Sequence, residues 1–202
     1  MSSKSHNPAI ILASSSPYRK TQLEQLGLTF RTDAPEIDET AEPGEKPVDL
    51  VQRLAIEKAR VVAQRHPGNL VIGSDQLAHL DHLIIGKAGN TENAIRQLQT
   101  FSGRVVEFLT AVAITEAGDS PEASESSCRV VSTHVHFRSL EIEEIVRYIA
   151  RDNPLDCAGS FKAERAGVSL MSALKSDDPT AIIGLPLIAV SELLRSRGVH
   201  IP

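Results

Sequence analysis

The sequence predicts an α/β fold in a single domain that covers residues 1–202. Strand-like apolar runs alternate along the chain with segments whose apolar residues recur at helical spacing, and this alternation is typical of α/β proteins. No repeat of about 20 to 50 residues recurs, which argues against a solenoid. With 41% hydrophobic and 23% charged residues, the chain is long enough to bury one sizeable core.

The first predicted strand leads into a helix at a serine-rich corner. Ser16 suits the N-cap of this helix and Pro17 its first position. The first turn carries Arg19 and Lys20 but no acid, although the helix dipole favours an acid there by about 0.3 to 1 kcal/mol. Free backbone N–H groups and the hydroxyls of Ser14 and Ser16 would form a phosphate cradle, in which Arg19 grips the anion. The alternative is that both cations are solvated surface residues.

A loop and a second helix follow. Residues 31–46 are acidic and rich in proline, which predicts a loop, and residues 47–65 have the apolar periodicity of a helix. Lys58 falls on the apolar face of this helix. A lysine in such a position usually extends to the edge of the apolar face, where its ammonium reaches water. The alternative is an ammonium that points into a cleft.

The segment LVIGSDQL predicts a buried strand that ends at residues 73–76. Ligands of open α/β sheets gather at the carboxyl ends of strands, so Asp75 is a candidate site residue by position. Residues 77–86 predict a hairpin around Asp81, which leads to Gly86 and Lys87. Because Ser-Asp and Gly-Lys pairs also occur in ordinary turns, these residues alone leave the question open.

The remaining elements complete the alternation of strands and helices. Residues 91–101 predict a helix and 105–115 a long strand, and a loop over 116–127 joins that strand to the next. Residues 131–138 alternate between apolar and polar side chains, so one face of this strand should be core and the other polar. A helix over about 142–149 follows. The last helix should start at Pro186 and end at Gly198.

Composition excludes several classes of function. A net charge of −5 and a pI near 5.8 argue against a general binder of nucleic acid or of acidic membranes, so any anion site must be local. Cys128 and Cys157 lack the spacing of a zinc site or of a disulfide framework, and we interpret them as reduced thiols. Residues 1–8 are expected to form a flexible polar extension, and the apolar run after them is too short for a signal peptide or a membrane span. We therefore expect a soluble, cytoplasmic protein.

The seven histidines do not indicate a metal centre or a nucleophile. His134 and His136 share the polar face of one strand, and His79 and His82 lie in the predicted hairpin. None has a spacing that fixes a ligand set with a cysteine or a carboxylate. The sequence also lacks the Walker, GxGxxG, HExxH and GxSxG motifs near the candidate residues. Local motifs therefore leave the activity undecided.

A set of short segments in a fixed order carries a family resemblance. The segments are LASSSPYR, EIDE, LAIEKA, GSDQ, GK, SGRVVEFLTAVA, LDCAGSF and IIGLPL. From about Ile10 to Arg195 the chain resembles the Maf family of nucleoside triphosphate pyrophosphatases. CAGSFKAE is similar to the subfamily that acts on 7-methyl-GTP, where other members carry a KAGAYGIQG-type stretch. The resemblance implies a twisted mixed sheet with flanking helices, two lobes around a deep cleft (Maf/ITPase-like), and a homodimer.

The resemblance also implies roles for individual residues. Asp75 matches the family's proposed catalytic base, and Glu39 matches its acidic residue near the metal and the phosphates. The residues that match the family's phosphate-binding positions are Ser14, Ser16, Arg19, Lys58 and Lys87, of which Arg19 and the two lysines are also expected to act in catalysis. Those that match positions associated with choice of base are Tyr18, Gln76 and Glu164. One departure is that the family usually reads GKP where this chain has Gly86, Lys87 and Ala88.

The implied activity is hydrolysis of a nucleoside triphosphate between its α and β phosphates. The products would be a nucleoside monophosphate and pyrophosphate, so the chain would be a hydrolase acting on acid anhydrides. We expect Mg²⁺ or Mn²⁺, held by Glu39, Asp75 and phosphate oxygens, and 7-methyl-GTP as substrate. Two alternatives are a pyrophosphatase for dTTP or UTP and a non-catalytic nucleotide-binding regulator of cell division. Asp75 favours an enzyme, because a pure binder would gain from a neutral residue beside a polyanion.

Overall fold

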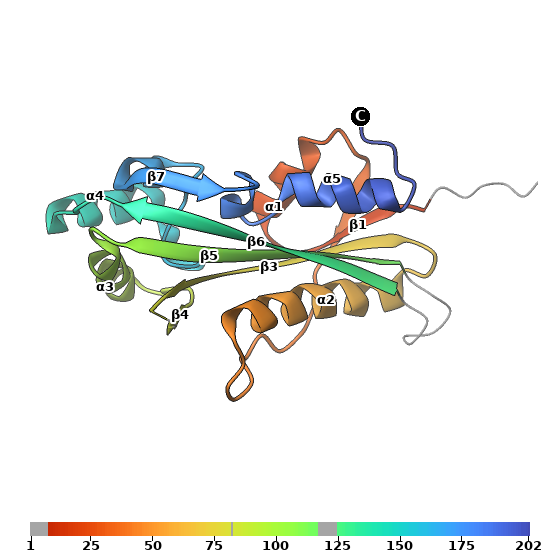
Figure 1. The fold of residues 1–202 in the computed structure, drawn as a ribbon, viewed down its shortest axis with the longest axis horizontal. Helices are drawn as coiled ribbons and strands as arrows, with labels where there is room; N and C mark the ends of the chain where they lie inside the picture. The colour runs from red at the N-terminus through yellow and green to blue at the C-terminus, as the bar shows by residue number, and fades with distance from the viewer. Residues whose placement is uncertain (1–7, 82, 117–124) are drawn as a thin grey trace, which may run out of the picture.

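The computed structural model describes residues 8–81, 83–116 and 125–202 and has a mixed, twisted sheet flanked by helices (Figure 1). The sheet order is β2-β1-β3-β5-β6-β7, and β4 pairs with β3. The strands are β1 (Ile10–Ala13), β2 (Phe30–Asp33), β3 (Leu70–Leu80), β4 (Leu83–Ile85), β5 (Val105–Glu116), β6 (Glu125–Phe137) and β7 (Met171–Ser176). The helices are α1 (Pro17–Glu24), α2 (Pro47–Arg65), α3 (Thr91–Phe101), α4 (Ile142–Asp152) and α5 (Leu187–Ser196), with short 3₁₀ turns η2 (Pro154–Asp156), η3 (Ala166–Leu170) and η4 (Ala181–Ile183). The predicted α/β class is confirmed.

Strand β3 changes neighbours along its length, and this corrects one prediction. β1 pairs in parallel with both β2 and β3, and its last residue, Ala13, lies opposite Gly73. Beyond Gly73, β3 continues in antiparallel pairing with β5 as far as His79. The prediction that the strand ends at residues 73–76 is wrong, because β5 supplies backbone partners where β1 does not. Asp75 therefore lies within β3, just past the carboxyl end of the parallel strands.

The first lobe has cores on both faces of the sheet. α2 packs on one face, where its apolar residues meet Ile11 and Val71. α5 and Leu23 of α1 pack on the other face against Leu12 and Ile72. Successive residues of β1 and β3 thus point to opposite cores, as expected for strands that are covered on both faces. In Figure 1, α2 lies below the sheet and α1 and α5 above it.

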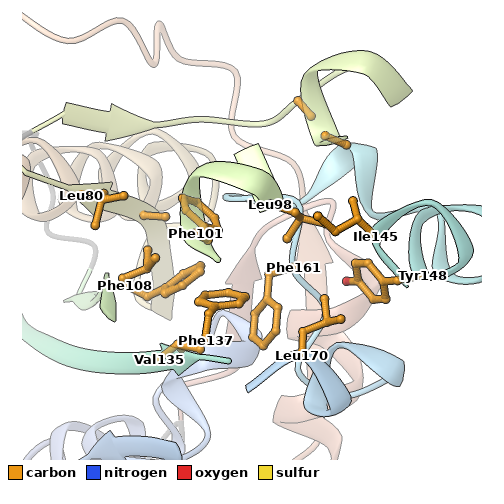
Figure 2. Packing of buried hydrophobic residues seen from close by; sticks show 14 of the residues in the cluster. Leu80, Leu98, Phe101, Phe108, Val135, Phe137, Ile145, Tyr148, Phe161 and Leu170 are labelled. Carbon is orange, nitrogen blue, oxygen red and sulfur yellow. The ribbon is translucent and has the colours of Figure 1, made fainter. Parts of the chain in front are cut away.

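The second lobe lies at the other end of the long strands β3, β5 and β6, where α3 and α4 are found (Figure 1). Its core is rich in phenylalanine, and Figure 2 shows Phe161 among these rings. The centre of the Phe161 ring is 5.9 Å from that of Phe108 and 5.2 Å from that of Phe137. Because Phe161 lies outside the regular helices and strands, its burial fixes an irregular segment against the second lobe.

Close contact between α2 and β3 depends on Gly73. A Cβ atom at this position would lie 2.2 Å from the carbonyl oxygen of Ala55 and 2.6 Å from the nitrogen of Ala59. Both are backbone atoms of α2, so no side chain fits between helix and strand here. This close packing brings Lys58 of α2 against Asp75 of β3.

Most predicted helices and strands are confirmed. Ser16 and Pro17 start α1, and the ranges 47–65 and 91–101 are those of α2 and α3. α5 begins one residue after Pro186 and ends at Ser196, so its predicted limits were slightly too wide. Both cysteines are free thiols. Residues 1–7 of the predicted extension over 1–8, His82, and residues 117–124 of the predicted loop over 116–127 lie outside the described residues. The predicted loops were too long, because residues 31–33 belong to β2, residue 116 ends β5 and residues 125–127 begin β6.

Candidate active site

A cleft of about 530 Å³ opens beside β3 and is lined by both lobes. It brings together every residue that the sequence singled out for chemistry. These residues are Ser14, Ser16, Tyr18, Arg19, Glu39, Lys58, Asp75, Gln76, Lys87 and Glu164. They come from positions scattered over most of the chain, so their convergence on one cleft is a product of the fold.

The serine-rich corner before α1 has the geometry of an anion cradle. Ser14 Oγ accepts a hydrogen bond from the backbone nitrogen of Ser16 (3.1 Å), and Ser16 Oγ accepts one from that of Arg19 (3.4 Å). Both hydroxyl oxygens thus act as acceptors within the corner, and their protons are left to donate outward. Together with the first N–H groups of α1, they can bind phosphate oxygens.

Arg19 is fixed by a backbone carbonyl from the far end of the chain. Its Nε donates to the carbonyl oxygen of Gly184 (2.8 Å), which also accepts from Ser74 Oγ (2.9 Å). Burial lowers the pKa of the Arg19 guanidinium, and the nearby charges of Asp75 and Glu39 act in the opposite direction. The guanidinium is therefore held at the cleft wall by one nitrogen, and its terminal nitrogens remain for an anion.

Lys58 points into the cleft and not along the helix to solvent. Its side chain is only 6% exposed, and Nζ lies 2.7 Å from Asp75 Oδ1 and 2.6 Å from Glu39 Oε1. The alternative of an ammonium aimed into a cleft is confirmed. A positive charge at this depth is tolerable because two carboxylates face it.

The pKa values of the two carboxylates beside Lys58 are shifted in opposite directions. Burial raises the pKa of Asp75, and the positive charges of Lys58 and Arg19 offset this only in part. Burial also acts to raise the pKa of Glu39, but the hydrogen bond and charge of Lys58 outweigh it, so the pKa of Glu39 is lowered. Asp75 is thus the carboxylate with greater affinity for a proton, which is the property of a general base.

The loop that carries Glu39 is tied to α2 by Arg53, a residue that the sequence analysis did not single out. Arg53 Nε and Nη2 donate to the carboxylate of Glu45 (2.7 and 2.8 Å), and Nη2 also reaches the carbonyl oxygen of Thr40 (3.1 Å). The hydrogen bond from Arg53 lowers the pKa of Glu45 to about 2. This bidentate contact positions the residues next to Glu39.

Lys87 reaches the cleft from the segment after β4. Its backbone forms an antiparallel bridge with Ala158, and Gly159 N donates to Gly86 O (3.4 Å). Ala88, where the resemblance implies a proline, is buried, and its carbonyl accepts from Asn93 Nδ2 (2.9 Å). The segment is therefore fixed by backbone contacts on both sides of Lys87.

The side-chain amide nitrogen of Gln76 is engaged in hydrogen bonds within the protein. Nε2 donates to Thr110 Oγ1 (3.0 Å) and to the carbonyl oxygens of Ala181 (2.9 Å) and Ile182 (3.1 Å). These acceptors fix the orientation of the amide, so its oxygen is the end that a ligand in the cleft can use. Tyr18 and Glu164 line the same cleft.

Few of the described side chains in the cleft could coordinate a metal ion. Among the described residues, no group of three or more histidine, cysteine, aspartate or glutamate side chains is placed to hold an ion. Glu39 and Asp75 supply two carboxylates, and both contact Lys58. Magnesium is commonly bound by one or two carboxylates together with substrate phosphates and water. The residues thus fit a divalent ion that arrives with a phosphorylated substrate.

Comparisons with known proteins show the family of this chain. A family model described as "Maf-like protein" matches residues 9–197. The chain belongs to the Maf family. Among similar proteins, a 7-methyl-GTP pyrophosphatase of Aromatoleum aromaticum is 50% identical over 96% of this chain and 97% of that protein. Proteins of the same name from Xanthomonas axonopodis pv. citri and Pseudomonas syringae pv. tomato are 49% and 47% identical, over 96% of this chain and 100% of each protein.

Two solved structures also match this Maf chain. They are Ham1 proteins from Coxiella burnetii and Staphylococcus aureus, at 18% and 13% identity and TM-scores of 0.40 and 0.41. The first match covers 63% of this chain and 73% of that chain, and the second 64% and 71%. Among the described residues of this Maf protein, no helix combines the length and the apolar character that crossing a membrane requires.

Several cleft residues of this Maf chain were not singled out by the sequence. Asp156 and Cys157 line the cleft, and Gly184 holds Arg19. Burial raises the pKa of the Cys157 thiol to about 12, so this thiol stays protonated and is a poor nucleophile. The segment CAGSFKAE contains Glu164, which the resemblance singled out, but the sequence gives no signal that Asp156 and Cys157 also face the cleft.

Proposed function

We propose that this chain hydrolyses a nucleoside triphosphate between the α and β phosphates, with 7-methyl-GTP as substrate. The observation that carries the proposal is the buried contact between Lys58 and Asp75 in a cleft that also presents Arg19 and Lys87. The reaction needs cations that stabilise the charge of a polyphosphate and a group that accepts a proton from water, and Asp75, whose pKa is raised, can be that group. The names of the relatives support the choice of substrate.

The cationic side of the cleft would bind the triphosphate. The hydroxyls of Ser14 and Ser16 and the first N–H groups of α1 donate to phosphate oxygens, and the guanidinium of Arg19 grips them at two points. Lys58 and Lys87 add positive charge, which stabilises the negative charge that develops on the attacked phosphorus and on the leaving pyrophosphate.

Asp75 would act as the general base. Its carboxylate accepts a proton from the attacking water, and the water's oxygen forms a bond to phosphorus while the bond to the leaving phosphate oxygen breaks. Lys58 favours the ionised form of Asp75 against the effect of burial, because removal of the positive charge would raise the pKa of Asp75 further. Mg²⁺ or Mn²⁺, held by Glu39, Asp75 and the phosphates, would supply further charge stabilisation as a Lewis acid.

The other side of the cleft would select the base. Guanine presents two adjacent donors, N1–H and the 2-amino group, and the carboxylate of Glu164 could accept both in a bidentate pair. The free oxygen of Gln76 and the ring of Tyr18 complete this side. Methylation at N7 leaves the ring positively charged, so Glu164 would gain a further electrostatic attraction.

The test is release of pyrophosphate from a panel of triphosphates with each divalent metal. The panel contains 7-methyl-GTP, GTP, UTP and dTTP, and both products are identified. We expect pyrophosphate and 7-methyl-GMP, and a higher kcat/KM for 7-methyl-GTP than for the others. Formation of orthophosphate and a diphosphate, or a preference for UTP or dTTP, would contradict the proposal. Family membership supports two further expectations, which are a homodimer and a single domain over residues 1–202. Light scattering would test the homodimer.

A further inference from the structure

Lys162 carries a buried ammonium group that the proposed reaction does not use. Lys162 is 5% exposed and is not itself part of the cleft wall. Its Nζ donates to the carbonyl oxygens of Asp152 (3.1 Å) and Asn153 (3.0 Å), which end α4. Nζ also lies 3.3 Å from Asp156 Oδ1 and 5.3 Å from the centre of the Tyr18 ring. One cation thus joins the end of α4, the turn η2 and α1.

The backbone at Lys162 is fixed independently of its ammonium. Lys162 N donates to the hydroxyl oxygen of Tyr148 (2.9 Å), and the preceding residue, Phe161, is buried in the second core (Figure 2). A Cβ atom at Gly167 would lie 2.3 Å from the carbonyl oxygen of Lys162, so the chain packs closely on this side too. The root of the side chain is therefore rigid, and the ammonium is held in one place.

Two of the groups that Lys162 contacts line the cleft. Tyr18 comes from the first lobe and Asp156 from the second, and the Asp156 side chain is 64% exposed. The ammonium lies over one face of the Tyr18 ring, so a ligand that stacks on Tyr18 in the cleft would use the opposite face. The carboxylate of Asp156 balances the ammonium, so the ring does not carry an uncompensated positive charge beside it.

We propose that Lys162 is a positioning residue for base recognition, which fixes the Tyr18 ring against the segment that carries Asp156. The inference rests on the proposed function, because it takes this side of the cleft to be the side of the base. Lys162 acts through Tyr18 and Asp156 and touches neither the phosphates nor the attacking water. Its loss should therefore weaken binding of the nucleotide and leave the chemical step unchanged.

The test is a double-mutant cycle between Lys162 and Tyr18. Lys162→Met, Tyr18→Leu and the double variant are compared with the wild type by calorimetric titration with 7-methyl-GMP, a readout that does not need turnover. We expect Lys162→Met to weaken binding about 5- to 30-fold, and the double variant to bind no worse than Tyr18→Leu alone. In assays with 7-methyl-GTP, Lys162→Met should raise KM while kcat stays within about threefold. Lys162→Arg should restore most of the affinity.

Controls separate this role from a loss of fold. Lys175→Met removes the same charge from an exposed position on β7 and should leave affinity unchanged. Additive losses in the cycle, or a fall in kcat at unchanged KM, would overturn the inference and leave the proposed function standing. Binding with the expected cycle but no pyrophosphate release by the wild type would overturn the proposed function alone.

A second variant covers the case in which Lys162→Met fails to fold. Asp156→Asn changes a mostly exposed side chain and keeps the contacts of Lys162 to the two carbonyls of α4. It leaves the ammonium unbalanced beside Tyr18, so affinity for 7-methyl-GMP, whose base is positively charged, should fall about 3- to 10-fold more than affinity for GMP. An equal change for both nucleotides would overturn the inference.

Discussion

Lys58 Nζ lies 2.7 Å from Asp75 Oδ1, and the two side chains are 6% and 10% exposed. Burial raises the pKa of Asp75, and Lys58 is the nearest charge that lowers it. The balance between these effects decides the pH at which Asp75 becomes a base. Two residues that lie 17 positions apart in the sequence thus control one titration.

The pH profile of the wild type and of Lys58→Met tests this relationship. Asp75 is active when deprotonated, so kcat/KM should rise with pH along an acid limb whose midpoint lies above the usual pKa of aspartate. Removal of Lys58 raises the pKa of Asp75 further, so the acid limb should move to higher pH. His134→Ala, a change on the exposed face of β6, should not move it. A limb that stays in place in Lys58→Met would contradict the assignment of Asp75 as the base.

Asp75→Asn distinguishes an enzyme from a binding protein. The amide cannot accept the proton of the attacking water, so turnover should fall by about 100-fold or more. Without added metal ion, loss of a negative charge beside the phosphates should leave nucleotide affinity equal or higher. Pyrophosphate release and calorimetric titration with the same nucleotide give the two values. Retained turnover would show that the base lies elsewhere.

Arg19→Ala and Lys87→Ala test the cationic side of the cleft. Each change removes a charge-assisted contact to phosphate worth about 1.5 to 3 kcal/mol, or roughly 10- to 100-fold in kcat/KM. Steady-state kinetics with 7-methyl-GTP measure the loss. Lys175→Ala, at an exposed position on β7, is the control and should lose little. An unchanged kcat/KM in either cleft variant would place the phosphate site elsewhere.

Glu164→Gln tests recognition of the base. A neutral amide offers one acceptor and an opposing donor group where the carboxylate offers two acceptors, so the purine edge loses its bidentate partner. Activity on 7-methyl-GTP should therefore fall more than activity on UTP. The ratio of the two kcat/KM values is the measurement. The same loss on both substrates would mean that Glu164 does not read the base.

Gly73→Ala tests the contact between α2 and β3. The added methyl group would meet backbone atoms of Ala55 and Ala59, so helix and strand must separate, at a cost of about 1 to 3 kcal/mol. A fall in Tm of roughly 2 to 4 °C for each kcal/mol is expected for a chain of this size. Gly86→Ala is the matched control, because nothing lies within 4 Å of a Cβ there. Equal Tm values for the two variants would contradict the close packing at Gly73.

Local signals in the sequence were sufficient to predict where helices start. Ser16 and Pro17 begin α1 as predicted, because capping and the fixed φ of proline act within a few residues. The end of β3 was not predictable in this way. It depends on pairing with β5, whose partner residues lie at least 28 positions away along the chain. The residues near the end of β3 in the sequence do not indicate that β5 will pair with it.

The candidate site was predictable as a set of residues but not as a geometry. A lysine on an apolar helix face allowed two orientations for Lys58, and only the carboxylates of Glu39 and Asp75 decide between them. Arg53 and Lys162 act through contacts with backbone carbonyls, which have no signature in the sequence. The residues that the proposed reaction requires could be predicted from the sequence, whereas the residues that hold them in place could not.

The carbonyl of Gly184 accepts hydrogen bonds from Arg19, 165 residues earlier in the chain, and from Ser74. During synthesis, the guanidinium of Arg19 therefore lacks its support until the segment around Gly184 has left the ribosome. Contacts of such long sequence separation form late and slow the folding of a domain. A nascent chain that is still being translated would carry an unfinished cleft, so activity should emerge in one late step and not grow with chain length.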